Sequence, residues 1–216
     1  MNRAWWNTTG QRSKNVRLRK GQLPILISIL CALAVFSVHF VTRKNYEFII
    51  YVGVIIFFLV VFIITNEKVY YPNSVLWGLL LWAVMHMAGG SVHINGTLLY
   101  KMMIISLSER YPVFRYDQLV HIMGFGVATT TLFYLLKPLL RPNVKGWAAL
   151  SIILVAAGLG VGTFNEIVEF IVSSTVPESN VGGYLNTSLD SVSDLIGAAL
   201  AMVVIRLTNR TLFTAQ

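Results

Sequence analysis

The chain has 216 residues, of which 56% are hydrophobic and only 12% are charged. Soluble domains carry roughly 25% charged residues, and several apolar runs here reach the roughly 20 residues needed to cross a bilayer. This composition excludes an ordinary soluble domain and predicts an all-α, polytopic membrane protein. The net charge of +8 is distributed as topology signals, so we expect the lipid bilayer and anionic lipid headgroups as partners and no nucleic acid. The oligomeric state is left open.

The expected elements are a basic tail followed by one membrane domain. Residues 1–22 hold six Lys or Arg residues and no acid, which predicts a cytoplasmic tail, and residues 23–210 form a six-span bundle. We place the spans at residues 23–41, 46–65, 74–91, 117–136, 146–172 and 189–207. The apolar segment 98–107 is too short to cross, so we expect a short interfacial helix between spans three and four.

Lysine and arginine residues set the orientation, because cytoplasmic segments of polytopic proteins carry an excess of them. With the N-terminus inside, the inner segments hold twelve of these residues and the outer segments hold five. We therefore expect a multi-pass protein of the cell (inner, or cytoplasmic) membrane, with the N-terminus and the C-terminus both in the cytoplasm.

This topology places the polar ends of spans three to six on the outer side. His86 and His93 lie seven residues apart, two turns along one face of span three. The ionisable residues of the next three spans are Asp117, His121, Glu166, Glu169, Asp190 and Asp194. Two of these pairs have i, i+4 spacing, which puts both members on one helical face. Ionisable groups inside spans are costly and usually face an interior cavity, so the cluster predicts a functional pocket.

The residue types in this pocket suit a metal ion. Helical bundles build metal sites from carboxylates and histidines that project inward from facing helices, and we expect His86, His121, Glu169 and Asp194 as ligands. Mixed nitrogen and oxygen donors fit zinc, manganese or iron, among which the sequence does not choose. The same set could also work without a divalent metal, with a buried carboxylate of raised pKa as acid or base. For the metal-assisted enzyme, Glu166 or Glu169 is the first candidate for general base.

Each residue also has a simpler structural interpretation. Residues 186–188 are typical of a helix N-cap, and Asp117 in a first helical turn would favour the helix dipole. His86 alone would be a hydrogen-bonded core histidine. Glu169 and Asp194 lie a turn inside their spans, where neither a cap nor a solvated face explains them.

Three motifs resemble those of the DUF2238 (YjdF-like) family of inner-membrane proteins, and VanZ-like proteins are more distantly similar. The motifs are R-x-D-x-x-x-H at residues 115–121, E-x-x-E at 166–169 and D-x-x-x-D at 190–194. Phe170 stands where the family's second motif has tryptophan. The resemblance covers roughly residues 75–205. It implies a helical membrane fold with a polar site and supplies no reaction.

The leading functional hypothesis is a membrane enzyme acting on a lipid or lipid-linked headgroup, with hydrolase-like, metal-assisted chemistry. Its catalytic site would consist of Asp117, His121, Glu166, Glu169, Asp190 and Asp194. One alternative is a transporter or proton-coupled permease, because intramembrane acids also relay protons. The sequence has no inverted repeat that would support it. Another alternative is a non-catalytic membrane assembly or accessory protein whose polar residues lock helices together.

Overall fold

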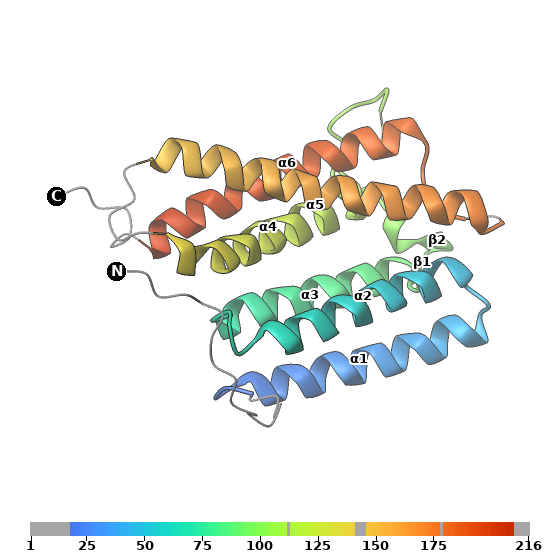
Figure 1. Ribbon diagram of the computed structural model, residues 1–216. Coiled ribbons are helices and arrows are strands. Elements are labelled where there is room, and N and C mark those ends of the chain that lie inside the picture. Colours follow the sequence, from blue (N-terminus) through green and yellow to red (C-terminus); the bar gives the residue numbers. More distant parts are fainter. Residues whose placement is uncertain (1–17, 112, 141–145, 178, 210–216) are drawn as a thin grey trace, which may run out of the picture.

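The computed structural model describes residues 18–111, 113–140, 146–177 and 179–209, so most of the expected basic tail lies outside the described residues. Within this part of the chain, six α-helices run back and forth side by side (Figure 1). The helices are α1 (Gln22–Thr42), α2 (Tyr46–Thr65), α3 (Asn73–Gly89), α4 (Tyr116–Leu136), α5 (Trp147–Thr175) and α6 (Tyr184–Thr208). A 3-10 turn, η2 (Lys137–Leu139), extends α4.

Five of these helices, all except α3, are long and apolar enough to cross a membrane. Many large hydrophobic side chains are exposed on their outer faces, where lipid would cover them. Helix α3 is apolar but has 17 residues, which gives it a length of about 25 Å against a hydrocarbon core of about 30 Å. The expectation of an all-α membrane protein is confirmed, while the sixth crossing depends on α3.

The bundle consists of two groups, α1–α3 and α4–α6, which meet chiefly where α3 packs on α4 (Figure 1). The closest packing is between α4 and α6. Two glycines allow this approach, because a Cβ on Gly197 of α6 would collide with the Ile122 carbonyl and lie 3.0 Å from the Gly126 nitrogen of α4. Small residues at helix interfaces let membrane helices pack backbone to backbone. This contact brings the polar beginnings of α4 and α6 together.

The expected interfacial helix over residues 98–107 is not confirmed. The chain after α3 instead forms a short antiparallel hairpin of β1 (His93–Ile94) and β2 (Thr97–Leu98), then a single 3-10 turn, η1 (Leu99–Lys101). Asn95 and Gly96 both have positive φ at the hairpin turn. Asn-Gly is the pair that favours this kind of two-residue turn, and it is the signal that hydropathy alone misses.

Beyond η1, the backbone pairs with the segment that leads into α4. The Ile104 N–H donates to the Phe114 carbonyl at 3.1 Å, and the Tyr116 N–H donates to the Met102 carbonyl at 2.9 Å. These backbone N–H and carbonyl groups are therefore hydrogen-bonded across the loop and not within a helical turn. As a result, the entry to α4 is fixed close to the end of α3.

Candidate functional site

Five acids and one histidine from α4, α5 and α6 converge towards the end of the bundle where α4 and α6 begin and α5 ends. They are Asp117 and His121 on α4, Glu166 and Glu169 on α5, and Asp190 and Asp194 on α6. Among the described residues, three overlapping sets of these side chains have one possible ligand atom each within 4.8 Å of one another. The sets are Asp117–His121–Asp190, His121–Glu166–Asp194 and Glu166–Glu169–Asp190. We call these six residues the polar cluster; all six were expected from the sequence.

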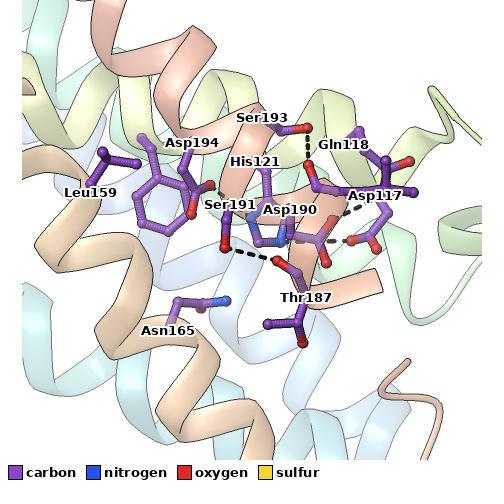
Figure 2. Close-up of polar contacts among 12 residues, drawn as sticks. Asp117, Gln118, His121, Leu159, Asn165, Thr187, Asp190, Ser191, Ser193 and Asp194 are labelled. Atoms are coloured by element: carbon purple, nitrogen blue, oxygen red, sulfur yellow. Dashed lines mark hydrogen bonds and ion pairs between the residues drawn. The ribbon is translucent and has the colours of Figure 1, made fainter. Parts of the chain in front are cut away.

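Figure 2 shows His121 between Asp194 and Asp117, and His121 belongs to two of the three sets. Its Nδ1 is 2.9 Å from Asp194 Oδ1, and its Nε2 is 3.8 Å from Asp117 Oδ1. His121 is 5% exposed and Asp194 is 1% exposed, so water screens this contact little. Gly162 of α5 faces the same carboxylate, because a Cβ at that position would collide with Asp194. The three helices therefore approach one another around the Asp194 side chain.

Two amide side chains hold the other aspartates in place. Gln118 Nε2 donates to Asp190 Oδ1 at 2.9 Å, and Asn186 Nδ2 donates to Asp117 Oδ2 at 3.2 Å and also to Asp190 Oδ2. The Gln118 side chain is itself fixed, since its Oε1 accepts the Arg115 N–H at 2.8 Å and caps the start of α4. Gln118 was not predicted as a site residue, although its position three residues before His121 places it on the same helical face.

The two glutamates of α5 differ in their surroundings. Glu169 Oε1 accepts a hydrogen bond of 2.8 Å from Asn165 Nδ2, one turn earlier on the same helix. Both carboxylate oxygens of Glu166 are buried and make no hydrogen bond of ordinary geometry with the described residues, although the side chains of Thr187 and Asn165 lie near enough to stabilise its charge. Burying a carboxylate without well-formed hydrogen bonds is costly. Glu166 is therefore the least well satisfied carboxylate of the polar cluster.

His86, expected as a metal ligand, belongs to none of the three sets. Its Nδ1 shares a hydrogen bond of 2.5 Å with the Tyr100 hydroxyl, and its ring packs among Phe48, Tyr51 and Trp82 at centroid distances of 5.7, 5.1 and 5.6 Å. Tyr100 lies in η1, and burial raises the pKa of its hydroxyl well above the usual 10, so the hydroxyl stays protonated. This environment matches the structural interpretation of His86 as a hydrogen-bonded core histidine.

His93 does not lie on the same helical face as His86, and that part of the prediction is wrong. Helix α3 ends at Gly89, and His93 lies in β1 with its side chain exposed. The Asn95–Gly96 turn that follows favours the hairpin, so the chain leaves the helical conformation before His93. His93 therefore lies outside the polar cluster.

Comparison with known proteins identifies a family to which the chain is similar. A family model described as a predicted membrane protein (DUF2238) matches residues 23–211, which is nearly the whole chain and includes every residue of the polar cluster. No curated protein and no solved structure matches it. The apolar helices and this match make the chain a membrane protein. The chain therefore belongs to the DUF2238 family.

Proposed function

We propose that this protein is a metal-assisted membrane hydrolase that acts on a lipid or lipid-linked headgroup at the polar cluster. The observation that carries the proposal is the Glu166 carboxylate, whose buried oxygens lie among other acids and make no hydrogen bond of ordinary geometry with the described residues. Two ionised carboxylates whose oxygens lie within 4.8 Å of each other repel each other by at least about 3 kcal/mol at an effective dielectric constant of about 20. A divalent cation bound between these carboxylates would attract both of them and so offset their mutual repulsion. It would also give Glu166 an oppositely charged partner.

The set His121–Glu166–Asp194 is the proposed ligand set. It draws one residue from each of α4, α5 and α6, and its possible ligand atoms lie within 4.8 Å of one another. One nitrogen and two oxygen donors suit zinc, manganese or iron. When bound, such an ion polarises a phosphoryl or carbonyl oxygen and makes water a better nucleophile near neutral pH.

The remaining residues of the polar cluster have roles that follow from their contacts. Glu169 is the proposed general base, since its hydrogen bond from Asn165 fixes the direction of one carboxylate oxygen, and the other oxygen would accept a proton from the attacking water. Asp117 and Asp190, held by Asn186 and Gln118, would accept hydrogen bonds from hydroxyl or amine groups of a headgroup. The proposed reaction is thus hydrolysis of an ester or phosphoester bond.

The proposed site faces the outer side of the cell membrane. This orientation requires α3 to complete a sixth crossing. It also requires both termini to lie in the cytoplasm, where the basic tail at residues 1–22 would lie near anionic lipid headgroups. Support comes from the charge pattern, since the segments at the polar-cluster end hold five of the 17 Lys and Arg residues. The connections α1–α2, α3–α4 and α5–α6 share this end of the bundle (Figure 1).

Two observations favour an enzyme over the alternatives. A permease needs a polar route to the opposite face, whereas the space between the helix groups, beside the polar cluster, is lined almost entirely by apolar side chains. A structural lock between helices needs satisfied hydrogen bonds. Asp190 and Asp194 have such bonds, but Glu166 does not.

The test uses the purified full-length protein with zinc, manganese or ferrous iron, and a phospholipid or a polyprenyl diphosphate as substrate. We expect headgroup release that stops on chelation and that falls by about 100-fold or more in Glu169→Gln, the range for losing a general base. Glu109→Gln is the matched control, since Glu109 is exposed outside the polar cluster. Release that is insensitive to chelation, or equal in the two variants, would reject the proposal.

A further inference from the structure

An apolar groove lies between the two helix groups and has a volume of about 340 Å³, within the size range of small-molecule sites. Side chains of α1 to α5 line it. We call it the inter-group groove. The hydroxyl of Thr131, which lines it, already donates to the Val127 carbonyl of its own helix at 2.9 Å. A peptide or sugar in the groove would lose hydrogen bonds to water without replacement, whereas a hydrocarbon chain would lose none.

One end of the inter-group groove meets the polar cluster. Asn165 lines the groove and donates its hydrogen bond to Glu169. The groove is also lined by Phe125, whose ring lies 5.5 Å from that of His121 between centroids, and by the Trp82 indole. Gly124 makes room for that indole, because a Cβ there would collide with Trp82. A ligand that fills the groove therefore begins beside the candidate site.

A buried polar pair lines the opposite end of the inter-group groove. Gln22 Nε2 donates to Asn66 Oδ1 at 3.1 Å, and Asn66 Nδ2 donates to Gln22 Oε1 at 2.8 Å. Both side chains are buried, at 3% and 5% exposure. An apolar chain end stops at such a pair, because entering further would break these hydrogen bonds.

The length of the inter-group groove matches one hydrocarbon chain. Its lining on α4 runs from Gly124 to Leu135, which is about 16 Å at 1.5 Å per residue and close to half of a hydrocarbon core of about 30 Å. We propose that the groove binds one acyl chain of the lipid whose headgroup enters the polar cluster, with the chain end at the Gln22–Asn66 pair. The identity of that lipid as substrate rests on the proposed function.

The test fills the groove at Ala128, which lines it on α4. Full-length protein is reconstituted in phosphatidylethanolamine–phosphatidylglycerol vesicles that contain a phospholipid with a photoreactive diazirine at the end of one acyl chain. We expect cross-links to concentrate near Gln22, at Ile25 and Leu26, and to fall by about fivefold or more in Ala128→Phe. Ala157→Phe is the control, because Ala157 is exposed on α5 and does not line the groove.

Cross-links spread evenly over the exposed helix faces, or unchanged by Ala128→Phe, would overturn the proposal. Preferential labelling by a polyprenyl probe with the same diazirine would show that the groove binds an isoprenoid chain and not an acyl chain, which would also overturn the proposal. Leu79→Trp, a second groove-filling change, is used if Ala128→Phe does not fold. Metal content is measured on the same samples: labelling of the groove without metal rejects the proposed function alone, and metal without such labelling rejects the groove alone.

Discussion

Substituting His121 with alanine is expected to abolish divalent-metal binding and to destabilise the protein by about 3 kcal/mol, the lower end for removing one partner of a buried pair. The change removes a ligand from two of the three sets. It also leaves Asp194, 1% exposed, without its 2.9 Å partner. For a chain of this size, the melting temperature should fall by roughly 6–12 °C. Metal analysis and thermal unfolding of the full-length protein in detergent measure both effects.

The matched control and a double substitution separate the two effects of the His121 change. His93→Ala should alter neither property, since His93 is exposed in β1. Replacing both partners, as His121→Leu with Asp194→Leu, should recover much of the lost stability, because no buried charge is left unpaired. It should not recover metal binding. Retained metal in either His121 variant would contradict the assignment of His121 as a ligand.

Substituting Glu166 with glutamine is expected to raise the stability of the metal-free protein and to weaken metal binding. The amide removes one negative charge from a group of buried acids and replaces a carboxylate that makes no hydrogen bond of ordinary geometry with the described residues. We expect a gain of roughly 1 kcal/mol, or about 2–4 °C in melting temperature. Loss of an anionic ligand should lower the affinity for zinc or manganese by about tenfold or more, which is the minimum effect seen even for groups that only support ligands.

The opposite changes in stability and affinity distinguish a binding residue from a structural one. Glu47→Gln is the matched control, because Glu47 is also buried but accepts a hydrogen bond of 2.7 Å from the Asn180 N–H. We expect that change to lower stability and to leave metal affinity unaltered. If Glu166→Gln destabilised the metal-free protein or bound metal as tightly as the unaltered chain, Glu166 would not be a ligand.

Most of the helices could be predicted because hydropathy reports contact with lipid directly. The expected span 46–65 coincides with α2 (Tyr46–Thr65), and the span 117–136 differs from α4 (Tyr116–Leu136) by one residue. The start of α6 at Tyr184, five residues before the expected 189, was missed. Residues 186–188 are polar and lowered the hydropathy, although Asn186 is helical and turned towards Asp117.

The residues of the candidate site could be predicted from the sequence because helical spacing determines which side chains share a face. Asp117 and His121 are four residues apart, and so are Asp190 and Asp194. What spacing within a helix does not give is the distance between helices, which here depends on the close contact of Gly197 with α4. For the same reason, the sequence could not show that His86 bonds to Tyr100 and stands apart from the polar cluster.

We propose that the meeting point of α4, α5 and α6 binds a divalent cation. Anomalous X-ray diffraction from crystals of the full-length protein grown with zinc and, separately, with manganese tests it most directly. We expect an anomalous peak about 2.0–2.2 Å from a ring nitrogen of His121 and from carboxylate oxygens of Glu166 and Asp194. No peak at these three side chains in either crystal, at metal concentrations that saturate binding in solution, would contradict it.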